Sequence, residues 1–273
     1  MKVTFDSNAW ERIFSPQWSF DHAAQHIAAI RSALMSGAMA GFICETTFRL
    51  ETLKRERVGL IAGSEFTLLE CKIRPEPDGE VHLMMSFGSD DRRHPGIDHR
   101  QLEKLTDAYL HGVRLIDGAA WMGLAGPSLP DWRSHTVLLT ETERTRKEEL
   151  HMDVFYTLQD AGVGMAPLNA RLQAMEKANG LATREGGWKI LDAISDEHER
   201  SRAVAEISEW ADAEVIATHY GYQNDFLCTE DQASSAKRSS FDNTSRRMLT
   251  ERFGIRFVDL AGLAARATQH SEA

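Results

Sequence analysis

The N-terminal part of the chain alternates between short apolar stretches and longer segments with helical periodicity. Residues 2–6 and 39–44 are expected to be short buried strands, and between them the apolar residues of 20–37 fall on one stripe of a helix. A second helix is expected over 45–57. Consecutive strands joined by helices pair in parallel, so this order predicts a parallel sheet covered by helices on both faces.

The C-terminal part returns to the same alternation after a long middle segment. The pattern predicts a helix over 195–220, a strand over 225–229, a helix over 243–253, a strand over 255–258 and a helix over 260–268. Together the two ends predict one α/β, doubly wound, mostly parallel sheet, formed by residues 1–58 and 191–273.

The middle segment, residues 59–190, interrupts this pattern and is expected to be an insertion packed on the core. Two strand-like stretches, 65–73 and 80–87, flank a Pro- and Gly-containing turn at 75–79, which predicts a β-hairpin. The remainder predicts helices over 99–112, 141–161 and 168–178 and a short strand over 113–116. The pattern gives no role for this segment.

Charge and cysteine content limit the classes of protein to consider. The net charge of −10 opposes a protein that coats nucleic acid, but not a nuclease whose acidic site holds cations. No apolar run approaches the roughly 18 residues of a membrane span. The start of the chain enters a strand directly, unlike a signal peptide. The three cysteines are far apart and odd in number, so we expect free thiols and a cytoplasmic location.

Four carboxylates are expected where an open parallel sheet binds its ligands, near the carboxyl ends of strands. Asp6 ends the first strand, Glu51 lies in the helix after the second, Asp212 lies in the helix before the fourth, and Asp231 lies just past that strand. Singly, such acids are commonly turn, cap or surface residues. As a converging set they would repel one another unless cations lay between them, and oxygen ligands suit Mg²⁺ or Mn²⁺.

Four short segments, 5–8, 42–51, 212–218 and 226–231, make the chain resemble a PIN domain. That family consists of metal-dependent ribonucleases, including toxin nucleases and RNA-processing enzymes. The resemblance covers about the first 58 and the last 80 residues. It implies a doubly wound sheet with an acidic pocket that binds Mg²⁺ or Mn²⁺.

The family's acidic residues are carried over onto this chain in order. Its first Asp falls on Asp6, its helix Glu on Glu51, its third acid on Asp212 and its closing acid on Asp231, and these four are the expected catalytic and metal-binding residues. The chain departs from the pattern in its long insertion and in having Glu45 where the family usually has a small hydroxyl residue. Whether Glu45 or Glu51 is the metal-site glutamate is left open.

Polar and basic neighbours complete the expected site. The resemblance places the family's small polar partner on Asn8 and the hydroxyl of its closing T-x-D motif on Thr229, both expected to hold the carboxylates by hydrogen bonds. Four basic residues follow Asp231 and are expected either to contact RNA phosphates or to lie on a solvated surface: Lys237, Arg238, Arg246 and Arg247.

The resemblance and the acids together predict a divalent-metal-dependent endoribonuclease that hydrolyses RNA phosphodiester bonds. The alternative is a catalytically silent PIN-like scaffold that binds a protein partner, which the acidic charge and the long insertion favour. Besides RNA, an inhibitor or antitoxin protein and a second copy of the chain are left open as partners, because family members often form dimers. No membrane partner is expected.

Overall fold

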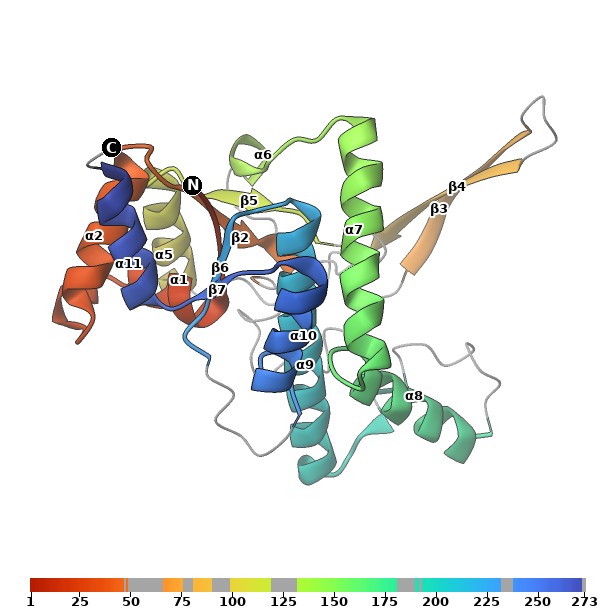
Figure 1. Cartoon of the computed structure of the whole chain (residues 1–273). Coiled ribbons are helices and arrows are strands. Elements are labelled where there is room, and N and C mark those ends of the chain that lie inside the picture. Colours follow the sequence, from red (N-terminus) through yellow and green to blue (C-terminus); the bar gives the residue numbers. More distant parts are fainter. Residues whose placement is uncertain are drawn as a thin grey trace.

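A computed structural model describes residues 1–46, 48, 66–75, 81–89, 99–118, 132–180, 190–191, 193–231 and 238–271 (Figure 1). At its centre lies a five-stranded sheet in the order β5-β2-β1-β6-β7, and every pairing in it is parallel. The strands are β1 (Lys2–Phe5), β2 (Ala40–Cys44), β5 (Arg114–Ile116), β6 (Phe226–Cys228) and β7 (Phe257–Val258). The expected α/β class with a parallel sheet is confirmed.

The chain reverses its direction of travel across the sheet at β1. Phe5 pairs with Ile43 of β2 on one side and with Cys228 of β6 on the other. From β1 the chain moves to β2 and β5, whereas β6 and β7 are added on the opposite side. The boundary between β1 and β6 is therefore the topological switch point, where open α/β sheets bind their ligands beyond the carboxyl ends of the strands.

One face of the sheet is covered by helices from both ends of the chain and from the middle segment (Figure 1). These helices are α1 (Ser7–Ile13), α2 (Ala24–Met35), α5 (His99–Leu110) and α11 (Leu260–Ser271). Val3 and Phe5 of β1 point into this layer, where they pack with Trp10 and Ile27. Alternate strand residues face the same side of a sheet, which explains why residues 3 and 5 share this core.

The opposite face is covered mainly by three helices, α7 (Glu141–Asp160), α9 (Glu197–Gly221) and α10 (Asn243–Phe253). Leu227 packs here with Trp210 and Ile216, while its neighbour Cys228 lies in the first layer. α9 begins with Asp196, whose side chain accepts a hydrogen bond from the amide of residue 199. Such an N-cap satisfies one of the amides that a helix leaves open at its start.

The middle segment contributes both a separate hairpin and part of the core. β3 (Phe66–Pro75) and β4 (Val81–Ser89) pair antiparallel in a sheet of their own, as expected, and project away from α7 (Figure 1). By contrast, β5 is an edge strand of the main sheet. The division into a core and an insertion at 59–190 stays a prediction, but β5 and α5 of that segment lie within the core.

Several boundaries differ from those expected. The segment 20–37 forms a short 3-10 helix, η1 (Trp18–Phe20), followed by α2, and α1 was not anticipated. α6 (Trp132–His135) and α8 (Ala166–Ala178) complete the described elements. Within the part of the chain that the structure describes, no helix is long and apolar enough to cross a membrane.

Candidate functional site

The carboxyl edge of the sheet carries an acid after every strand. Because all five strands are parallel, these acids lie along the same edge. Each strand is followed by one such acid: Asp6 after β1, Glu45 after β2, Asp117 after β5, Glu230 after β6 and Asp259 after β7. Asp231 comes directly after Glu230.

Asp6 occupies the switch point and is completely buried. It directly follows β1, stands at the N-cap position of α1 without a side-chain capping hydrogen bond, and donates its amide to the carbonyl of Cys228 at 2.9 Å. Only 1% of the residue is exposed. Its Oδ2 accepts a hydrogen bond of 2.8 Å from the Thr229 hydroxyl, whereas its Oδ1 has no hydrogen-bond donor among the described residues. One oxygen of this buried carboxylate is thus left for a further ligand.

The surroundings of Asp6 disfavour its charge. Burial raises the pKa of Asp6 to about 6, against the opposing hydrogen bonds from Thr229 and the Ser7 amide, and the nearby charge of Asp231 raises it further. Carboxylates that approach one another without a cation destabilise each other's ionised forms. The charge of Asp231 thus acts on Asp6, and a shared site for the two carboxylates stays a prediction.

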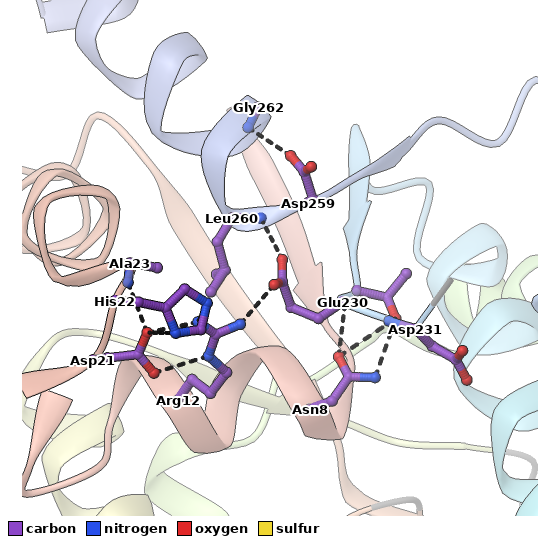
Figure 2. Close-up of polar contacts among 11 residues, drawn as sticks. Asn8, Arg12, Asp21, His22, Ala23, Glu230, Asp231, Asp259, Leu260 and Gly262 are labelled. Carbon is purple, nitrogen blue, oxygen red and sulfur yellow. Dashed lines mark hydrogen bonds and ion pairs between the residues drawn. The ribbon is translucent and has the colours of Figure 1, made fainter. Parts of the chain in front are cut away.

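Asn8 and Thr229 accept hydrogen bonds from the amides of the turn that carries Asp231; the contact of Asn8 is drawn in Figure 2. The Asn8 Oδ1 accepts from the amide of Glu230 at 2.8 Å, and the Thr229 Oγ1 accepts from the amide of Asp231 at 3.1 Å. The Thr229 amide in turn donates to the carbonyl of Val258 at 3.0 Å. Both predicted supporting residues lie at the site and contact the segment that bears its acids.

Arg246 is the predicted basic residue that lies beside these acids. It extends from α10, donates a hydrogen bond to the main-chain carbonyl of Asp231, and stacks over Phe241 and Phe257. Burial lowers the pKa of Arg246, although the charges of Asp231 and Asp6 raise it. Arg238 and Arg247 are exposed, and Lys237 lies outside the described residues.

The remaining predicted acids are not joined to Asp6 by any contact described above. Asp212 lies half-buried on α9, and its approach to Asp6 stays a prediction. Glu51 lies outside the described residues. Glu45 instead pairs with Asp117, which directly follows β5 and was not anticipated from the sequence.

The Glu45–Asp117 pair forms a second acidic place on the same edge. Desolvation of its carboxyl group raises the pKa of Asp117 to about 6, and the charge and hydrogen bond of Glu45 add to this. Lys147 and Arg144 act in the opposite direction. Lys147 also donates a hydrogen bond of 2.5 Å to the carbonyl of Gly118. This pair therefore has two cations beside it.

The residues present fit a divalent cation in part. The open Oδ1 of Asp6 and the nearby Asp231 are hard oxygen donors of the type that Mg²⁺ and Mn²⁺ prefer. Among the described residues, which leave out Glu51, no three His, Cys, Asp or Glu side chains lie close enough to hold one ion. Asp212 is among these described residues and does not complete a set of three with Asp6 and Asp231 here, so the predicted ligand left to do so is Glu51.

No family model, no curated protein and no solved structure matches this chain. Its resemblance to PIN domains therefore depends on the short motifs and on their order along the sheet.

Proposed function

We propose that the chain is a PIN-like, divalent-metal-dependent endoribonuclease. The observation that carries this proposal is Asp6, a fully buried acid at the switch point of a parallel sheet, with one carboxylate oxygen that has no donor among the described residues. Burial raises the pKa of Asp6, and the charge of Asp231 raises it further. A bound cation would relieve this repulsion and would satisfy the open oxygen. The order of the acidic motifs supports RNA as the substrate class.

The roles of the residues follow from their positions. Mg²⁺ or Mn²⁺, when bound, supplies an activated water and a clamp for the scissile phosphate. Asp6 and Asp231 hold the cation, with Asp212 and either Glu51 or Glu45 as the further ligands that the motif order assigns. Thr229 and Asn8 fix the acids by hydrogen bonds.

The basic residues are assigned to the RNA backbone. Arg246 reaches the edge of the acid pair and offers a guanidinium to a phosphate beside it. Lys237, Arg238 and Arg247 would extend this contact along the strand. Since the chain is acidic as a whole, we expect RNA binding to be local and weak without the cation.

Cleavage of single-stranded RNA in the presence of Mn²⁺ or Mg²⁺ tests the proposal. We expect Asp6→Asn to reduce the rate by more than about 100-fold, beyond what the loss of an outer-shell group produces. Asp225→Asn is the matched control, because this acid precedes the same strand, β6, at its opposite end and accepts a hydrogen bond from the Lys2 amide. Equal activity of wild type and Asp6→Asn across a broad RNA panel would refute the proposal.

A second candidate function is a catalytically silent scaffold that binds a protein partner. The observation that favours it is Arg246, whose guanidinium already lies beside Asp231 and Asp6 and offsets part of their charge. In that case the edge would be a fixed polar surface. Calorimetric titration with Mn²⁺ separates the two candidates, because only the nuclease requires binding that disappears in Asp6→Asn.

A further inference from the structure

The turn that carries the acidic site is fastened through a residue that does not face the site. Glu230 lies between Thr229 and Asp231, and its side chain is directed away from that of Asp231, towards α1 and the start of α11 (Figure 2). Because Glu230 is covalently bonded to Thr229 and Asp231, a shift of the Glu230 backbone also shifts these two residues.

Glu230 is held at three points by two different elements. Its amide donates to Asn8 Oδ1 at 2.8 Å, its Oε2 accepts from Arg12 Nη1 at 2.6 Å, and its Oε1 accepts from the Leu260 amide at 2.8 Å. The Leu260 amide is one of those that α11 leaves open at its N-terminus, so the carboxylate also favours that helix end.

A second carboxylate, that of Asp21, also holds the Arg12 side chain that binds Glu230. Its Nε and Nη2 donate to the two carboxylate oxygens of Asp21 at 3.0 and 2.6 Å, and Asp21 also accepts from the Ala23 amide at 2.8 Å. The hydrogen bond from Arg12 is the main reason why the pKa of Asp21 is lowered to about 2. The Arg12 and Glu230 side chains are only 23% and 27% exposed, so solvent does not readily compete for their ion pair.

The two residues of α1 that hold Glu230 are spaced four positions apart. Residues with this spacing share one helix face, so Asn8 and Arg12 grip the amide and the carboxylate of Glu230 from the same side. Asp6 stands at the N-cap position of this same helix. α1 is thus a short rigid spacer with Asp6 at its start and the Thr229–Asp231 turn fastened to its side.

We propose that Arg12 and Glu230 are positioning residues of the acidic site, which fix the separation of Asp231 from Asp6. This inference rests on the proposed function, since it assigns to the pair an effect on divalent-cation binding. Arg12 and Glu230 act only through the turn and do not contact the cation. Loosening their ion pair lets the turn move away from Asp6 and lowers the affinity of the site more than it weakens the fold.

Arg12→Gln tests the inference, with Arg171→Gln as the matched control. Arg171 also bridges two carboxylates, Glu206 and Glu199, but it joins α8 to α9 away from α1 (Figure 1). By calorimetry, we expect Arg12→Gln to raise the Kd for Mn²⁺ by about 10- to 100-fold, the range for groups that orient metal ligands. Arg171→Gln should lower Tm to a similar extent and leave that Kd unchanged.

Amide hydrogen exchange followed by NMR provides a readout that does not need the metal. In Arg12→Gln the amides of Glu230 and Asp231 should exchange faster, while they stay as in wild type in Arg171→Gln. If Arg12→Gln does not fold, Glu230→Gln and Arg12→Lys replace it in both measurements. Arg12→Lys should bind Mn²⁺ more tightly than Arg12→Gln, because it retains the positive charge.

The outcomes are separable. A Kd in folded Arg12→Gln or Glu230→Gln within twofold of wild type, or an equal rise in Arg171→Gln, overturns the positioning role. If wild type binds no Mn²⁺, the proposed function fails, and the exchange of the two amides alone decides whether Arg12 and Glu230 hold the turn.

Discussion

Two acid pairs lie on the same edge of the sheet and differ in what surrounds them. Asp6 is fully buried beside Asp231 and receives hydrogen bonds from neutral donors, with Arg246 as the nearby cation. Asp117, which pairs with Glu45, is an exposed residue. The charges of Lys147 and Arg144 act to lower the pKa of its carboxyl group. In both pairs the pKa of one aspartate is nevertheless raised to about 6, by burial of its carboxyl group first and by the charge of the second acid in addition.

The difference indicates which pair is built for an external cation. The fold supplies the Glu45–Asp117 pair with its own ammonium and guanidinium groups, and solvent reaches it. The Asp6 pair combines burial, an open carboxylate oxygen and hydrogen bonds that favour the charged form, which is a costly arrangement unless a further positive charge arrives. We therefore place the functional centre at Asp6 and give the Glu45–Asp117 pair a secondary role.

The largest expected effect is on stability as a function of pH. Burial raises the pKa of Asp6 in the folded state to about 6, above the 3.8 of an ordinary aspartate, so the folded state favours the protonated acid. The charged Asp6 lowers the free energy of unfolding. This loss is fully present above pH 6 and disappears as the pH falls through 6 towards 4. In EDTA, we expect Asp6→Asn to stabilise the protein at pH 8 by roughly 3 kcal/mol, with no gain near pH 4.

Denaturant unfolding of wild type and Asp6→Asn at pH 4, 6 and 8 measures this difference. Asp117→Asn is the comparison, and its gain at pH 8 should stay below about 1 kcal/mol because solvent and neighbouring cations screen an exposed pair. A gain for Asp117→Asn as large as that for Asp6→Asn would remove the distinction between the two pairs.

A smaller effect is expected at the cation that already lies beside Asp6. Arg246→Gln removes a partly buried positive charge next to the acid pair, and we expect the Kd for Mn²⁺ to fall on the order of tenfold. The KM for RNA should rise in the same variant, because a phosphate contact is lost. Calorimetry and cleavage kinetics measure the two changes, with Arg252→Gln, an exposed residue at the other end of α10, as control.

An unchanged Mn²⁺ affinity in Arg246→Gln would mean that the cation does not enter the place that Arg246 faces. A loss of affinity would assign Arg246 to the support of the turn, through its hydrogen bond to the Asp231 carbonyl.

Much of the architecture was predictable from periodicity. The strands at 2–6, 39–44 and 225–229 and the long helix α9 have patterns of apolar residues that match their burial in the structure, and the hairpin was predictable from its turn residues. The place of Asp6 and Asp231 on one edge followed from the carboxyl ends of strands that lie side by side in a parallel sheet. These features depend on local sequence and on topology alone.

The features that sequence did not predict depend on contacts between distant segments. Asp117 follows a strand of only three residues, β5, whose place beside β2 no local pattern specifies. Arg12 and Glu230 are 218 positions apart, and neither has a sequence context that distinguishes it from a surface residue. α1 was missed because it has only seven residues, and its buried Trp10 and Ile13 are explained by the sheet above them.

Diffraction from a crystal soaked in Mn²⁺, with anomalous scattering recorded at the manganese edge, tests the central claim most directly. We expect a single strong anomalous peak bonded to the carboxylate oxygens of Asp6 and Asp231, with Asp212 or a glutamate completing the ligands. No peak beside Asp6, or a peak confined to Glu45 and Asp117, would contradict the assignment of the functional centre to the switch point of the sheet.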